Sequence, residues 1–436
     1  MLMPDPSSKE ITRAPVLTIP PEITAHIFTY CLTDFTSAPD IDTAPLLLGR
    51  ICSDWRNIAW HSPELWTSLK VDRRDIPVAL VETWLSRAQG LPLALELVIP
   101  DSEWDGTEVI AVFERYSQTW REITLDLPVE QLYLFGSDLA LPLLERLTIR
   151  SEVFPEEGVV LDHPFRNASA LRRLTLDRPV LLTSLPWAHI TSFTSESGYL
   201  SPEVFLTILQ HTPNIVNCSV AIYNENESDR LPDVAPQLVF LISLSLESVN
   251  PDALDIFDHI SVPALRVLNL SSTLFSGRVL VQHLQRILSN PDFQLHELSI
   301  RIDGDKPKEE DFIQLLEAQP TLEKFELVEG SLDLLIAICR RLSDGSPLLP
   351  RLSSLTASPH IYPASEITTT FPVMLDALVD ALSTRWVADS ESFARIQDCD
   401  LSWSGQRTDD LDNIVAAFLP RQAELVALGI NIAVNT

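Results

Sequence analysis

The sequence predicts an α/β protein in which a small N-terminal helical module precedes an irregular solenoid of strand–helix repeats. One observation behind this prediction is a short apolar motif that recurs through most of the 436 residues. The other is the segment before the first copy, where apolar residues recur at helical spacing instead. We expect a disordered tail at 1–15, a helical module at 16–66, a repeat domain at 67–404 and a C-terminal helical cap at 405–436.

The recurring motif has the form L-x-x-L-x-L. It starts at residues 120, 144, 171, 241, 265, 295, 322 and 352, with degenerate copies from 66, 215 and 396 and a poorly formed one near Ile190. Starts at 120, 144 and 171 are 24 and 27 residues apart. The last two leucines of the motif lie two residues apart, so both point to the same face of a short strand.

Segments with apolar residues at helical spacing separate these strands. They are residues 201–211, 278–289, 308–319 and 331–343. One strand and one helix cannot bury their own apolar faces, so neighbouring units must stack into one core. The chain in this respect resembles leucine-rich-repeat proteins over roughly 65–405, which implies an α/β horseshoe. It departs from that family in its uneven loops and in lacking the Asn or Cys that follows the strand.

Side chains between the buried leucines should project from the concave sheet face of such a solenoid. This surface is polar and of mixed charge, which suits a protein ligand, although the face could instead be merely solvated. The substrate-binding candidates are Arg146, Arg150, Arg173, Thr175, Asp177, Glu247, Arg301, Asp398 and Asp400.

The N-terminal module is expected to contain two helices. The first is expected to have Thr18 as its N-cap and Pro20 and Pro21 in its first turn. It has one apolar stripe of Ile23, Ile27 and Cys31 and another of Phe28 and Leu32. The second helix places Leu48, Ile51, Trp55 and Ile58 on one face.

Three tryptophans of this region have different expected environments. Trp55 shares the apolar face of the second helix and is expected in the core of the module. Trp60 lies about 140° further round that helix, so we expect it to be exposed. Trp66 opens the first repeat strand and is expected to seal the junction between module and repeats.

The module resembles an F-box, with Ile19-Pro20-x-Glu22-Ile23, Ile27-Phe28 and Leu32, then Ile51-Cys52-x-x-Trp55-Arg56-x-Ile58-Ala59 and Leu65-Trp66. The resemblance implies docking onto the Skp-type adaptor of a cullin–RING ubiquitin ligase, while the repeats hold a protein substrate. The adaptor-binding residues it implies are Ile19, Pro20, Pro21, Glu22, Ile23, Ile27, Leu47, Leu48, Ile51 and Cys52. For each one the alternative is packing inside the module.

Composition limits the other function classes. The chain has 31 Lys+Arg against 61 Asp+Glu, a formal net charge of −30, so a nucleic-acid partner is not expected. It has no run of about 18 apolar residues and no signal-peptide pattern, and we expect neither membrane insertion nor secretion. The five cysteines are scattered without CxxC pairing, which indicates buried free thiols of a cytoplasmic and/or nuclear protein.

Catalytic motifs are not apparent in the sequence, which has no nucleophile elbow, P-loop, dinucleotide-binding turn or HExxH helix. No cofactor or metal is expected. Asp398 and Asp400 would face the same way, as paired glycosidase carboxylates do, and an acidic hydrolase is the weakest alternative. We therefore expect a non-enzymatic substrate receptor, with a repeat scaffold that lacks ligase coupling as the second alternative.

Overall fold

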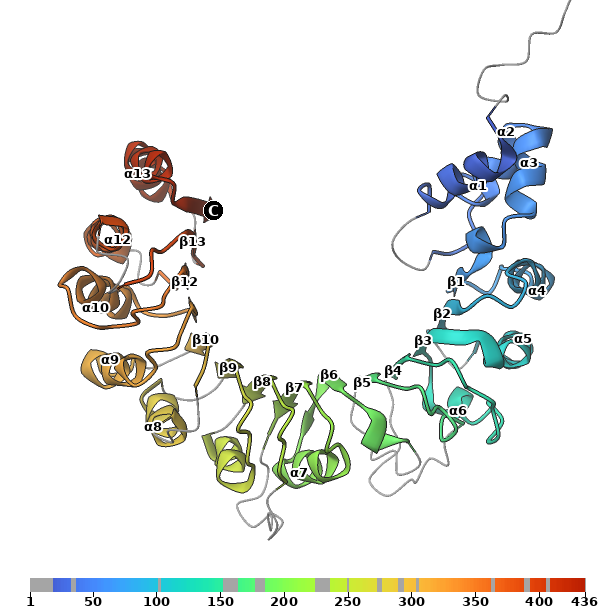
Figure 1. Ribbon diagram of the computed structural model, residues 1–436, viewed down its shortest axis with the longest axis horizontal. Helices are drawn as coiled ribbons and strands as arrows, with labels where there is room; N and C mark the ends of the chain where they lie inside the picture. Colours follow the sequence, from blue (N-terminus) through green and yellow to red (C-terminus); the bar gives the residue numbers. More distant parts are fainter. Residues whose placement is uncertain are drawn as a thin grey trace, which may run out of the picture. The chain divides into compact units, whose positions relative to one another are not determined.

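The computed structural model describes residues 19–32, 37–100, 103–151, 164–176, 185–223, 236–248, 251–272, 277–288, 294–302, 306–361, 365–387, 393–404 and 408–435 (Figure 1). The expected tail at 1–15, Thr18 and Asp177 lie outside these ranges. The chain forms two compact units. Unit 1 comprises Met1–Leu176 with Leu182–Pro186, and unit 2 comprises Asp177–Leu181 with Trp187–Thr436. The division falls inside the segment expected to form one repeat domain.

Unit 1 begins with short helices and continues as alternating strands and helices. The helices α1 and α2 both pack on α3. The strands pair in parallel, each with the next along the chain. The elements are α1 (Pro21–Thr29), α2 (Leu46–Ile51), α3 (Ser53–Trp60), η2 (Pro63–Trp66), β1 (Ser68–Val71), α4 (Val78–Arg87), β2 (Leu93–Val98), α5 (Thr107–Arg115), η3 (Ser117–Thr119), β3 (Trp120–Asp126), α6 (Val129–Leu132), β4 (Arg146–Arg150) and β5 (Arg173–Leu176).

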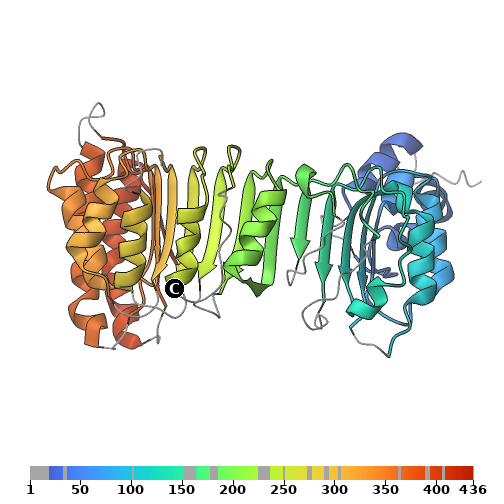
Figure 2. The same ribbon diagram turned by 90° about the horizontal axis from the view of Figure 1, so that it is seen from below.

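Unit 2 is a parallel sheet with helices along one face (Figures 1 and 2). Its strands also pair in chain order. The elements are η4 (Trp187–His189), β6 (Ser192–Leu200), α7 (Pro202–His211), β7 (Asn217–Ile222), β8 (Ser243–Ser248), η5 (Pro251–His259), β9 (Val267–Ser272), α8 (Gly277–Leu288), β10 (Glu297–Ile302), α9 (Glu309–Glu317), β11 (Lys324–Val328), α10 (Leu332–Ser343), β12 (Ser354–Ser358), α11 (Ser365–Thr369), α12 (Phe371–Val387), β13 (Asp398–Ser402), α13 (Asp409–Leu428) and β14 (Asn431–Asn435).

Copies of the motif form the strands other than β2 and β14 as predicted, and the α/β class is confirmed. Leu298 and Ile300 of β10 are buried, as is Leu295 just before the strand, while Ser299 and Arg301 point to the opposite face. Parallel register sets Leu298 beside Leu268 of β9 and Phe325 of β11, so each motif adds one layer to a continuous apolar core. The predicted helices at 201–211, 278–289, 308–319 and 331–343 correspond to α7, α8, α9 and α10.

The C-terminal segment differs from the expected helical cap. The helix α13 is present, but β14 follows it and pairs in parallel with β13. Alternation of the buried Ile430 and Ile432 explains why the chain continues the sheet there. In the part of the chain that the structure describes, no helix is long and apolar enough to cross a membrane.

The second helix predicted for the N-terminal module is broken in two. Cys52 is extended (φ −155°, ψ 171°), which separates α2 from α3, and its Sγ accepts a hydrogen bond from the Trp55 backbone N–H at 3.4 Å. Cys52 is therefore the N-cap of α3. The break turns Ile51 to the surface while Leu48 is buried, so the predicted single face does not exist.

The three tryptophans of this region occupy three different environments. Trp55 packs edge-on against the buried Phe28 of α1, with 5.0 Å between ring centroids, and Trp60 is exposed as predicted. Trp66 lies in η2 and the strand begins two residues later, at Ser68. Trp66 is fully buried, and its Nε1–H donates to the Ala59 carbonyl of α3 at 2.9 Å.

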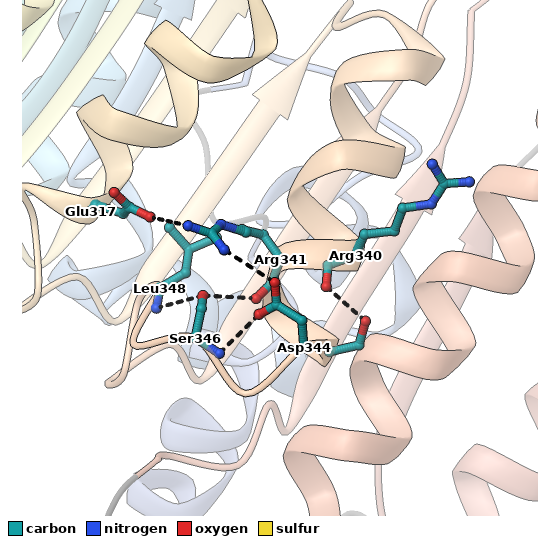
Figure 3. A network of polar contacts seen from close by, with 7 residues as sticks. Glu317, Arg340, Arg341, Asp344, Ser346 and Leu348 are labelled. Atoms are coloured by element: carbon teal, nitrogen blue, oxygen red, sulfur yellow. Dashed lines mark hydrogen bonds and ion pairs between the residues drawn. The ribbon is translucent and has the colours of Figure 1, made fainter.

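A polar network fixes the loop that follows α10 (Figure 3). The Arg341 guanidinium bridges Glu317 of α9 (3.1 Å) and Asp344 (3.2 Å), and the Ser346 N–H donates to Asp344 Oδ1 (2.9 Å). Although desolvation opposes the effect, the Ser346 and Arg341 hydrogen bonds lower the pKa of Asp344. The loop is thereby held against its own helix and against the preceding repeat.

Candidate functional site

The first candidate surface is an exposed apolar stripe on α1. Ile23, Ile27 and Tyr30 lie at positions i, i+4 and i+7, so they share one helix face. Ile23 is 53% and Ile27 45% exposed, whereas Thr24 and Phe28 on the other face are buried. We call Ile23, Ile27 and Tyr30 the α1 stripe. The sequence shows two apolar stripes on this helix, and the structure turns the Phe28 side inward.

One contact between helices orients α1, and one hydrogen bond within its first turn satisfies a buried hydroxyl. Phe28 packs against Trp55 of α3, which anchors the buried face of the helix. Thr24 Oγ1–H donates to the Pro20 carbonyl at 3.2 Å, so this buried hydroxyl is satisfied. Pro20, and not the predicted Thr18, is the helix N-cap, and it makes no side-chain hydrogen bond. Packing of Phe28 on Trp55 therefore fixes which face of α1 is buried, and the α1 stripe on the other face is left exposed to solvent.

The structure separates the remaining adaptor-binding candidates into surface and core. Leu47 and Ile51 of α2 are exposed, four residues apart on one helix face, and Pro20, Pro21 and Glu22 are exposed beside the α1 stripe. Ile19 and Cys52 are partly exposed, although Cys52 Sγ is occupied in capping α3. Leu48 is only 4% exposed and belongs to the core of the unit, so its prediction as a docking residue is corrected.

The open sheet face of unit 1 carries the second candidate surface. Register sets Arg146 of β4 between Glu122 of β3 and Arg173 of β5. Arg146 Nη1 pairs with Glu122 at 3.1 Å, and Thr175 lies beside Thr148 in the next row. Arg150 aligns with Asp126 further along the strands. The predicted arginines thus lie on one face, partly neutralised by carboxylates.

Sequence reasoning missed one strand of this face. Lys70 of β1 and Glu96 of β2 are aligned and form an ion pair at 2.9 Å, and the hydrogen bond to Glu96 raises the pKa of Lys70. The segment 93–98 has no copy of the motif, so Glu96 was not among the candidates. Alternation of the buried Leu93, Leu95 and Leu97 is the signal that identifies the strand.

The open face of unit 2 is rich in hydroxyl and carboxylate groups. Ser299 Oγ–H donates to Glu326 at 2.7 Å, and Lys324 pairs with Glu297 at 2.7 Å. The candidates Glu247 on β8 and Arg301 on β10 also lie on this face. Because β9 to β12 lie between them, β8 with Glu247 and β13 with Asp398 are about 24 Å apart at ordinary strand spacing. These candidates form an extended surface rather than one small pocket.

Asp398 and Asp400 both lie on the open face of β13. Asp398 is aligned with Ser354 and Asn431, and Asn431 Nδ2–H donates to it at 3.2 Å. Asp400 is aligned with Thr356 and Ala433. The aligned neighbours are small and none is aromatic, whereas sugar-binding clefts offer aromatic faces for stacking. The surroundings of this pair therefore give no support to the hydrolase alternative.

The cysteines and acidic groups offer little chemistry in the described ranges. Cys218, Cys339 and Cys399 are buried free thiols, and desolvation raises the pKa of each to about 12, which keeps it protonated at neutral pH. Cys31 is exposed and Cys52 partly so, which corrects the expectation that all five are buried. Among residues whose positions are described, no three His, Cys, Asp or Glu side chains form a group that could hold a metal ion.

The function of these surfaces cannot be assigned by similarity to known proteins. The α1 stripe and the two open sheet faces are defined by their own geometry and chemistry. They offer an apolar helix face in unit 1 and polar sheet faces in both units, which are features of protein-binding surfaces. No protein-family model and no curated protein matches the sequence of this chain.

Proposed function

We propose that this chain is the non-enzymatic substrate-recognition subunit of a cullin–RING ubiquitin ligase. In this proposal residues 16–66 form an F-box-like module that binds a Skp-type adaptor, and the repeats form an irregular leucine-rich-repeat solenoid that binds a protein substrate. The receptor would act in the cytoplasm or nucleus by bringing substrate lysines close to the conjugating enzyme, a proximity effect. The α1 stripe is the observation that supports the adaptor half best.

The chemistry of the α1 stripe fits docking of a helix into an apolar groove. Such docking uses apolar anchors at positions i, i+4 and i+7, and Ile23, Ile27 and Tyr30 have that spacing. Single exposed apolar residues are common on monomers, but three on one helix face support a surface that a partner covers. Leu47 and Ile51 of α2 add two further exposed anchors in the same module.

The adaptor half is tested with the double substitution Ile23→Asp and Ile27→Asp. Both side chains are exposed, so the variant is expected to keep the circular dichroism and melting temperature of the wild type while losing about 100-fold in affinity for a Skp-type adaptor. Isothermal titration calorimetry with purified adaptor measures the loss. The double substitution Val373→Asp and Val387→Asp, at two exposed positions on α12, controls for the two added negative charges.

Two outcomes would contradict the adaptor proposal. Unchanged adaptor affinity of the double variant would remove the α1 stripe from the interface. If the wild-type chain itself binds no adaptor at micromolar concentrations, the ligase proposal fails. The chain would then be a leucine-rich-repeat protein-binding scaffold without ubiquitin-ligase coupling.

The substrate half is supported by the mixed polar surface of the open sheet faces. Reversing Arg146, Arg150 and Arg173 to glutamate changes the charge of the open face of unit 1 by six. We expect substrate recovery in affinity purification, with the ligase inhibited, to fall about tenfold or more, because like charges across an interface cost several kcal/mol. Adaptor recovery in the same purification should be unchanged. Undiminished substrate recovery would place the substrate site elsewhere.

A further inference from the structure

The last helix of unit 2, α13, presents an exposed apolar stripe to solvent. Only Leu411, Phe418 and Leu425 of its twenty residues are buried, whereas the neighbouring α12 buries residues along its whole length. Leu419 is 52% and Val426 53% exposed, and Ala416 and Ala423 are exposed beside them. We call Ala416, Leu419, Ala423 and Val426 the α13 stripe.

The α13 stripe faces away from the rest of unit 2. At 3.6 residues per turn its four members fall within roughly 80° of helix circumference. Arg421, on the opposite side of α13, pairs with Asp376 of α12. The helix order α10, α12, α13 in Figure 1 shows the same arrangement, with α13 outermost in its layer. The stripe therefore occupies the position where a further helix would stack.

The edge of the sheet in the same repeat is already blunted. In a parallel strand the N–H and C=O of one residue point to the same side, and Asn431 N–H bonds to Gln397 next to β13. Ile432 must then point to the free edge, where its carbonyl accepts a hydrogen bond from Gln422 Nε2–H of α13 at 3.0 Å. Gln422 thereby occupies one hydrogen-bonding group of the free edge, which makes strand addition there less favourable.

The spacing and sizes of the stripe residues indicate what covers it. Ala416, Leu419, Ala423 and Val426 lie at i, i+3, i+7 and i+10, the seam of a two-helix coiled coil. In an antiparallel pair related by a two-fold axis near Arg421, Leu419 faces Ala423 of the other copy and Ala416 faces Val426. Each large residue then meets a small one, so the seam is self-complementary, as an isologous interface requires.

We infer that α13 pairs with the α13 of a second copy of this chain to form an antiparallel homodimer. The charge distribution is compatible with a second copy of the chain, because the four stripe residues are uncharged in a chain with a formal charge of −30. Asp409 and Asp412 continue the same face toward the start of α13. In the antiparallel pair they lie opposite residues 433 and 430, past the end of the helix, so the two acidic chains meet at the uncharged four-residue segment. A seam this short buries less than the roughly 1,600 Å² of a standard interface, which is the size class of weak and transient assemblies, so the test covers micromolar concentrations.

The assembly is tested by analytical ultracentrifugation of the full chain from about 1 to 200 µM. The wild type is expected to shift from monomer to dimer over this range. Leu419→Arg should raise the dimer dissociation constant about 100-fold, since it buries an unpaired charge in an apolar seam. Leu428→Arg is the matched control, because Leu428 is 44% exposed on the other side of α13. A monomer at every concentration, or a dimer unaffected by Leu419→Arg, overturns the inference.

Disulfide trapping tests the register in a Cys31→Ser, Cys52→Ser background that removes the thiols that are not buried. Chains carrying Ala416→Cys and chains carrying Val426→Cys should cross-link when mixed. Neither should cross-link alone, because ten residues of helix put like positions ~15 Å apart in an antiparallel pair. Cross-linking of each chain with itself, or none in the mixture, contradicts the antiparallel seam. Neither experiment depends on adaptor binding, so its failure is distinct from failure of the ligase proposal.

Discussion

Replacing Trp66 by alanine is expected to lower the free energy of unfolding of unit 1 by about 4 kcal/mol. Trp66 has no exposed surface, and its Nε1–H donates to the Ala59 carbonyl at 2.9 Å. Its ring packs edge-on against Trp84 of α4 with 4.9 Å between centroids, and the Arg87 guanidinium stacks 4.5 Å from its ring centroid. One side chain therefore joins α3 to α4, the first helix of the repeats.

Several separate losses add up in this variant. A cavity replaces a fully buried tryptophan, the Ala59 carbonyl loses one of its donors and keeps the Ser62 N–H, and the aromatic and cation–π contacts disappear. The desolvation that lowers the pKa of Arg87 is compensated by its two aromatic neighbours, Trp60 and Trp66. Loss of Trp66 leaves Arg87 with only one of them.

Hydrogen exchange followed by mass spectrometry measures this loss, because a chain with two compact units need not unfold in one step. Peptides from 53–98 should lose protection, while those of unit 2 serve as the internal reference. Trp60→Ala is the matched control. Trp60 contacts the same Arg87 guanidinium at 4.8 Å but is exposed, so its removal should cost less than about 1 kcal/mol. Equal effects of the two substitutions would contradict the assigned roles.

The repeat strands could be predicted because each one must bury one face in the same way. A strand with a helix on one face needs two inward apolar residues two apart, and the preceding Leu fills the turn, as Leu295, Leu298 and Ile300 do. The motif therefore records burial directly. The strands β2 and β14 were not predicted because they lack the first leucine of the L-x-x-L-x-L motif. Their inward residues only alternate with outward ones. Their signal is plain alternation, which other segments share.

Orientation in the N-terminal module could not be predicted from spacing alone. α1 has apolar residues on two adjacent stripes, and which one is buried depends on Trp55, which is brought to Phe28 by a different helix. The break at Cys52 was hidden because Leu48, Ile51, Trp55 and Ile58 fit one continuous helix by periodicity. A thiol that accepts the Trp55 N–H ends that helix, and cysteine is a weak N-cap signal.

A buried arginine in unit 2 was also missed, although its position shows on the sequence. Arg385 continues the series Met374, Leu378 and Ala381 along the buried face of α12. An arginine there is normally taken as solvent-exposed, because charged residues are almost never fully buried without partners. Its partners are backbone carbonyls and a ring, which no residue pattern reveals.

Replacing Arg385 by alanine is expected to destabilise unit 2 by about 4 kcal/mol. Arg385 is 2% exposed, and burial lowers the pKa of its guanidinium. Its Nε–H donates to the Leu342 carbonyl at 3.3 Å, and its Nη2–H donates to the Leu348 carbonyl. The guanidinium also lies 4.3 Å from the Phe393 ring centroid. Arg385 thus ties α12 to the end of α10 and to the loop of Figure 3.

The substitution Arg385→Met separates the desolvation cost of the buried charge from the stabilisation by its hydrogen bonds. Methionine fills most of the volume and removes the cost of a buried charge, so packing alone would leave stability unchanged or improved. Two carbonyls would nevertheless lose their donors, at about 1–3 kcal/mol each. We therefore expect the methionine variant to be destabilised by about 2 kcal/mol, between wild type and alanine.

Urea titration with hydrogen exchange on peptides from 332–387 gives both values, with peptides of unit 1 as the reference. Protection should fall first in the loop around Leu348, since its carbonyl depends on the guanidinium. A methionine variant as stable as the wild type would show that the desolvation cost of the charge equals the worth of its hydrogen bonds. Arg385 would then determine the position of the loop without stabilising the unit.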